Sequence, residues 1–136
     1  MQIQHVALIA LGTVLAIAGC SEGRRNVDGH TLYTDYCAAC HGDSGRGDGH
    51  LAASLTPPPA DLTTLSARNG GQFPMLAMMA KVYGYAEGRG GGGGPMPEFG
   101  PLLQGELILI ETEDGLVTPT PEKLVALADH VRSLQR

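Results

Sequence analysis

Cys37-Ala38-Ala39-Cys40-His41 is the stretch of sequence that decides how the rest of the chain must fold. Two thiols separated by two residues and followed by a histidine form the attachment motif of a c-type haem. Each thiol can form a thioether with one haem vinyl group, and the imidazole can bind the iron from the proximal side. The alternatives are a redox pair, which needs a thioredoxin-like strand and helix that are not visible before the motif, and a zinc site. Structural zinc commonly needs a second Cys-x-x-Cys pair, which the sequence lacks.

The composition agrees with one haem domain. The chain has 136 residues, of which 43% are hydrophobic but only 4% aromatic, and it contains no Trp. A core so poor in large side chains can be filled by a haem. The net charge of -5 and the scattered basic residues argue against a nucleic-acid partner, because phosphate binding needs clustered Lys and Arg.

The N-terminus has the pattern of an export signal. Residues 6–18 are apolar or small, a run too short for the roughly 20 residues of a membrane span but suited to a secretory signal. Residues 17–20, Ile-Ala-Gly-Cys, resemble a bacterial lipobox, in which the chain is cut before the cysteine and its thiol receives a lipid. We therefore expect a lipoprotein signal peptide over residues 1–19; an uncleaved signal anchor is the alternative.

Lipidation would explain Cys20, the one cysteine outside the haem motif. Residues 20–27 would then form the lipidated cysteine and a polar tether, and residues 28–136 the folded domain. Ser21 follows Cys20, and by resemblance to lipoprotein sorting in Gram-negative bacteria a residue other than Asp there favours the outer membrane. The expected location is the periplasmic face of a bacterial membrane.

The haem motif is predicted to lie at the end of a helix. Asp28 is a suitable N-cap, and apolar residues follow it at spacings of three and four. Gly42 is a natural helix end, so this helix would deliver both thiols and His41 together. Residues 42–49 form a glycine-rich loop, which we expect to let the backbone pass close to a flat ligand.

The remainder of the chain is predicted to be mostly short helices. One or two turns are expected in residues 51–55, an extended run at 57–59, and a short helix capped by Asp61. A longer helix should follow Pro74. Its apolar stripe comprises Met75, Leu76, Met79, Val82 and Tyr83.

The C-terminal part contains a predicted β-hairpin and a terminal helix. The hairpin joins residues 107–110 to residues 116–118 through an Asp-Gly turn. Thr120 and Pro121 look like the N-cap and first residue of the last helix. The apolar face of that helix comprises Leu124, Leu127, Ala128, Val131 and Leu134.

From Asp28 to Arg136 the chain resembles a small class I monohaem cytochrome c. The resemblance rests on the haem motif, on the later sequence Pro-Met-Pro around Met96, and on the terminal helix. It implies a mainly α fold, with three to five helices around one haem and the first and last helices crossing beside it. The hairpin is an addition to the minimal fold, and His130 stands where the family often has an aromatic residue.

The resemblance also implies a sixth ligand, usually a methionine that precedes the last helix. Met96 matches that position, and thioether ligation opposite histidine raises the haem potential. The cofactor-binding residues are therefore predicted to be Cys37, Cys40, His41 and Met96, with iron bound by the last two. The alternatives are Met75, Met78 and Met79 by sequence and His30, His50 and His130 by residue type.

These residues predict electron transfer by one covalent haem c, not an enzyme. With both axial positions filled by protein, the haem can only change its oxidation state. The protein would be a membrane-tethered carrier or a cytochrome subunit with redox proteins as partners. The alternative is an enzyme or a gas or redox sensor with five-coordinate haem, and a lipid-anchored binding protein without haem is a third possibility.

Overall fold

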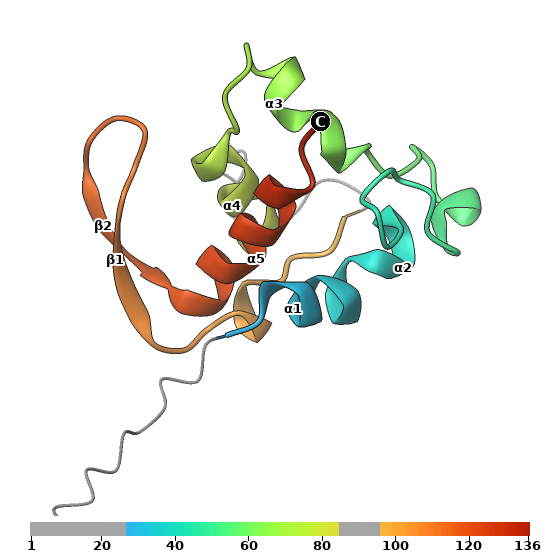
Figure 1. Ribbon diagram of the computed structural model, residues 1–136. Helices are drawn as coiled ribbons and strands as arrows, with labels where there is room; N and C mark the ends of the chain where they lie inside the picture. The colour runs from blue at the N-terminus through green and yellow to red at the C-terminus, as the bar shows by residue number, and fades with distance from the viewer. Residues whose placement is uncertain (1–26, 85–95) are drawn as a thin grey trace, which may run out of the picture.

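The computed structural model describes residues 27–84 and 96–136 (Figure 1). It confirms a mainly helical domain with a two-stranded hairpin before the last helix. In the part of the chain that the structure describes, no helix is long and apolar enough to cross a membrane.

Helix α1 (Gly29–Tyr36) begins as predicted. The carboxylate of Asp28 accepts hydrogen bonds from the backbone N–H groups of His30 and Thr31, at 3.1 and 3.3 Å. The predicted single helix is wrong, because it is interrupted at Cys37 and resumes as α2 (Ala38–His41). The second segment ends at Gly42, whose φ of 76° favours glycine. Cys37 therefore lies at the junction of two helical segments.

The glycine-rich loop folds back on α2. The N–H groups of Gly47, Gly49 and Leu51 donate to the carbonyls of His41, Cys40 and Ala39, which the end of a short helix leaves without partners. A Cβ atom on Gly49 would lie 2.4 Å from the Ala39 oxygen. The glycines of the loop therefore let its backbone lie close to the backbone of α2. The hydrogen bonds between the loop and α2 hold the haem motif in position.

The middle of the chain is built from short elements, as expected. They are the 3-10 turns η1 (Ala52–Ser54) and η2 (Leu62–Thr64) and the helices α3 (Leu65–Arg68) and α4 (Met75–Tyr83). Asp61 caps η2 by accepting from the Thr63 N–H at 2.9 Å, which confirms its predicted role. Pro74 precedes α4 as its N-cap, and Met79 and Val82 are its buried residues.

The hairpin is present and is longer than predicted. Strands β1 (Leu107–Glu111) and β2 (Val117–Pro121) pair antiparallel, after a third 3-10 turn, η3 (Gly100–Leu102). Thr120 is not a helix cap: it pairs with Ile108 in the sheet, and helix α5 (Glu122–Ser133) starts after Pro121. The strand pairing continues to the helix because the Glu122 N–H donates to the Glu106 carbonyl.

The crossing of α1 and α5 forms the centre of the core (Figure 1). Tyr33 from α1 and Leu127 and Val131 from α5 are almost completely buried. The helices approach so closely at Gly29 that a Cβ atom there would lie 2.0 Å from the backbone oxygen of Ala126. The first and last helices therefore cross, as the resemblance implied, and only glycine fits at this point of the contact.

We expect Gly29→Ala to destabilise the domain by about 3 kcal/mol, the upper end of the usual cost of overpacking. The added methyl group meets backbone rather than a flexible side chain, so the two helices must move apart. Urea unfolding followed by circular dichroism measures the change. Thr34→Ala, on the exposed side of the same helix, is the control and should change the free energy of unfolding by under about 0.5 kcal/mol. Equal effects of the two substitutions would contradict this view of the crossing.

His130 takes part in the same crossing and is a packing residue. Its ring centroid lies 5.0 Å from that of Tyr33 and 5.2 Å from that of His30. Its Nε2 atom is buried and has no hydrogen-bond partner among the described residues. Burial, followed by the proximity of His30, lowers the pKa of His130, whereas Asp28 acts in the opposite direction. The neutral imidazole is therefore the form that fits between the helices.

Stability should consequently fall as the pH is lowered from about 6.5, the ordinary pKa of histidine. Above this pH His130 is neutral in both the folded and the unfolded chain. Below it the unfolded chain takes up a proton that the folded chain resists, until the lower pKa of the folded state is reached. The test compares urea unfolding of the native chain and His130→Phe between pH 7.5 and pH 5. The native chain should lose more stability than the variant, and identical slopes would refute the role of His130.

Candidate haem-binding site

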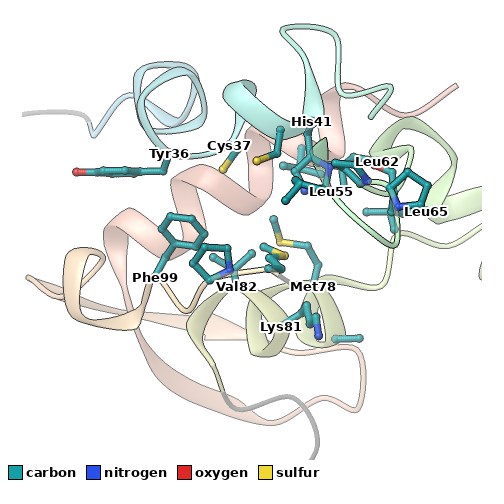
Figure 2. A pocket seen from close by; sticks show the side chains of 18 of the residues that line it. Tyr36, Cys37, His41, Leu55, Leu62, Leu65, Met78, Lys81, Val82 and Phe99 are labelled. Carbon is teal, nitrogen blue, oxygen red and sulfur yellow. Dashed lines mark hydrogen bonds between the residues drawn. The ribbon is translucent and has the colours of Figure 1, made fainter. Parts of the chain in front are cut away.

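A cavity of about 400 Å³ lies next to the haem motif (Figure 2). One side is formed by α2 and the stretch 55–62, and the other by α4 and residues 96–99. This volume falls within the range of about 300–1,000 Å³ that is usual for ligand and cofactor pockets. Several lining residues, including Pro57, Pro58 and Lys81, are solvent-exposed, so one edge of the cavity opens to water.

The proximal side of the cavity is formed by His41, which is buried. Its Nδ1 atom lies 2.9 Å from the carbonyl oxygen of Ala60. Because a carbonyl can only accept, Nδ1 carries the proton and Nε2 keeps a free lone pair. A hydrogen bond of this kind fixes the ring orientation and the tautomer of a metal-binding histidine.

The two thiols of the motif line the same cavity. Cys37 is buried and Cys40 is partly exposed, and neither forms a disulfide. Burial, with a smaller effect of the neighbouring Cys40, raises the pKa of Cys37 to about 11. A redox-active Cys-x-x-Cys pair instead needs a thiol with a lowered pKa. The environment of Cys37 therefore opposes the redox alternative and suits a sulfur that is held in a covalent bond.

The walls of the cavity are mostly apolar. Helix α4 contributes one face, on which the lining residues recur at helical spacing: Pro74, Ala77, Met78, Lys81 and Val82. Phe99 and Tyr36 close one end, with ring centroids 6.0 Å apart (Figure 2). Lys81 is the only charged side chain among the described lining residues. Apolar walls of this kind can bury a large apolar ring. Any charged substituents of that ring would have to lie at the open edge of the cavity, in contact with water.

Two methionines line the cavity, Met78 from α4 and Met96 from the segment before η3. Both are half-buried. Met79 instead points into the core and is 5% exposed, and Met75 is not among the lining residues. The structure thus places the four predicted residues Cys37, Cys40, His41 and Met96 around one cavity, and it brings Met78, one of the alternatives, to the same cavity.

The other candidate residues lie elsewhere. His50 is exposed and does not line the cavity, and His30 and His130 lie at the crossing of α1 and α5. Cys20 and Pro95 lie outside the described residues. The sequence did not predict that the Ala60 carbonyl accepts the hydrogen bond from His41, because every residue has a backbone carbonyl and the residue type therefore does not mark it. The three prolines before Ala60 were the available hint, since they hold that stretch extended beside His41.

These groups fit a covalently bound haem. A paired thiol motif, a histidine with a free Nε2 atom and a thioether opposite it surround one apolar cavity, and the imidazole is already oriented by a hydrogen bond. We assign the cavity to the haem on this observation. In the described parts of the chain, no group of three or more His, Cys, Asp or Glu side chains is placed to hold a metal ion by itself.

Comparison with known proteins agrees with the geometry. The family model described as Cytochrome c matches residues 27–135, and no curated protein matches the chain. A domain of this family carries covalent haem c, and its members are typically electron carriers rather than enzymes. The match covers the haem motif, the other segments that line the cavity, and the terminal helix up to residue 135. The chain therefore belongs to the cytochrome c family.

Proposed function

We propose that this protein transfers single electrons through one haem c attached to Cys37 and Cys40, with His41 and Met96 as axial ligands. The observation that carries the proposal is the hydrogen bond of 2.9 Å between His41 Nδ1 and the Ala60 carbonyl, which aims the remaining lone pair into an apolar cavity. When bound, the haem supplies the change between ferric and ferrous iron. The protein's own residues bind and orient the haem and exclude water from it.

The residues of the cavity set the conditions for that change. His41 donates electron density, and its hydrogen bond to Ala60 strengthens this donation. The apolar walls remove water and favour the less charged, reduced state. A thioether is a weak donor that likewise favours the ferrous form, so thioether ligation predicts a high potential.

Met96 is preferred over Met78 as the resting ligand because of its backbone. Pro97 fixes its own φ and restricts Met96 to extended geometry, and Pro95 has a fixed φ on the other side. A weak bond benefits from a ligand whose position is already restricted. Helix α4, by contrast, already has a structural task in packing against α5.

Carbon monoxide separates electron transfer from the five-coordinate alternative. It binds ferrous haem only where an axial position is open. The reduced native protein should remain six-coordinate and resist carbon monoxide, and it should be oxidised and reduced reversibly in a potentiometric titration. Immediate binding of carbon monoxide to the reduced protein would contradict the proposal and favour a sensor or an enzyme.

We further propose that the domain is held at the periplasmic face of a bacterial membrane, the outer membrane favoured, by a lipid on Cys20. The lipobox-like residues 17–20 and the polar residues that follow them support this placement. The tether from Cys20 to Asp28 spans at most about 28 Å when extended. Redox partners must then lie on the same membrane or diffuse to it.

We expect Cys20→Ala to abolish membrane retention of the haem protein or to block its maturation. The variant lacks the thiol to which a lipid would be attached, so a correctly processed chain has no anchor. Haem staining of membrane and soluble fractions after cell lysis measures the distribution, with Ser21→Ala as the control that keeps the cysteine. A correctly cleaved Cys20→Ala protein that stays in the membrane fraction would argue against the lipid.

A further inference from the structure

The wall of the cavity opposite His41 carries one more sulfur than a single axial bond requires. Met78 lies in the middle of the lining face of α4, between Pro74 and Val82. Figure 2 shows its side chain across the cavity from His41, on the side where a sixth ligand must stand. A leucine would fill the same space without offering a donor atom.

Helix α4 holds Met78 in a fixed place. On the core side of the helix, Met79 and Val82 are buried at 5% and 4% exposure, and the helix packs against α5. The side chain of Met78 itself has three rotatable bonds, so its sulfur can move while the backbone stays where it is. Met96 comes from a different segment, so that displacement of one methionine does not require displacement of the other.

We propose that Met78 is a reserve axial ligand, which binds the haem iron through its thioether sulfur when the bond to Met96 is lost. The inference rests on the proposed function, because it requires an iron with His41 on its proximal side. In the exchange the iron–sulfur bond to Met96 breaks and one to Met78 forms. No proton or electron is transferred, because both ligands are neutral thioethers.

The competing donor on the same wall is Lys81. A lysine amine must lose a proton before it can bind a metal, whereas a thioether has no proton to lose. Exchange to the Met78 sulfur therefore needs no coupled proton transfer, whereas exchange to an amine does. Methionine oxidation gives the exchange a use. If a peroxide transfers one oxygen atom to the Met96 sulfur and is itself reduced to water, the first thioether is lost, and Met78 would keep the iron closed to small molecules until a thiol-dependent reductase returns the sulfoxide to the thioether.

The test uses the full chain matured with haem and compares Met96→Ala with Met96→Ala/Met78→Leu. The first variant should keep the charge-transfer band of thioether–iron ligation in the oxidised state, at a shifted position, and should resist carbon monoxide when reduced. The double variant should lose the band and bind carbon monoxide. Met96→Ala/Met75→Leu is the matched control and should behave as Met96→Ala alone, because Met75 does not line the cavity.

A high-spin or nitrogen-ligated Met96→Ala protein that binds carbon monoxide with Met78 in place would overturn the proposal. Labelling of methionine methyl groups with ¹³C provides a readout that needs only the single variant. One methyl resonance of reduced Met96→Ala should be strongly displaced by the haem ring current, and its absence also counts against Met78. Failure of the proposed function itself is recognised separately, in the native protein and in Met78→Leu alone. A native protein without the charge-transfer band has no thioether ligand, and loss of the band in Met78→Leu would make Met78 the resting ligand instead of a reserve.

Discussion

Replacement of both Cys37 and Cys40 by alanine should leave little folded protein. By our assignment the haem would fill the cavity of about 400 Å³ between α2 and α4, and without it the apolar side chains on the two walls have nothing to pack against. At roughly 24 cal/mol per Å³, an unfilled cavity of this size costs up to about 10 kcal/mol. That figure is an upper bound, because one edge of the cavity opens to water, yet it rivals the total stability of about 5–15 kcal/mol of a small domain.

The measurement is the thermal unfolding of purified variants, followed by circular dichroism. The single variant Cys40→Ala is the control: it keeps one possible thioether at Cys37 and should retain part of the haem and a cooperative transition. The double variant should show little helix and no cooperative transition. A folded and cooperatively melting double variant would show that the helices hold together without the haem.

Exchange of Met96 for histidine should lower the reduction potential by an amount on the order of 100 mV or more. Axial ligands set haem potentials over a range of about 0.8 V, and a second imidazole stabilises ferric iron where a thioether favours ferrous iron. The variant should stay low-spin and closed to carbon monoxide but lose the thioether charge-transfer band. Potentiometric titration of the native protein and the variant gives the shift.

Met75→His is the matched control for this exchange. It places the same side chain on α4 at a position that does not line the cavity, so the potential should stay close to the native value. If Met96→His left the potential and the band unchanged, Met96 would not be the resting ligand. Loss of both in Met78→Leu instead would move that role to α4.

Local side-chain chemistry made much of the fold predictable from the sequence. Asp28 and Asp61 cap the elements assigned to them, and the Asp-Gly turn joins two strands, because these residues satisfy backbone groups within a few positions of themselves. The prediction that Thr120 is the N-cap of the last helix was wrong. Its cap-like position before a helix was overridden by pairing with Ile108 on the other strand of the hairpin, which extends further than its sequence pattern indicated.

The site was predictable only in part. Cys37, Cys40 and His41 lie within five residues, so one motif predicts their chemistry. Met96 was predicted as a ligand from the family resemblance, and that role stays a prediction. The break at Cys37 and the hydrogen bond from His41 to Ala60 depend on how the loop 42–49 folds back. The separation of Met78 from Met79 depends on the rotation of α4 about its axis, which the packing on α5 fixes.

The most direct test of the account is the absorption spectrum of the native protein, matured with haem and recorded oxidised and reduced. We predict low-spin haem c in both states, with the thioether–iron charge-transfer band in the oxidised state. The haem should also remain with the chain after denaturation, as covalent attachment to Cys37 and Cys40 requires. A high-spin spectrum without that band, or haem that separates from the denatured chain, would contradict the assignment of these residues.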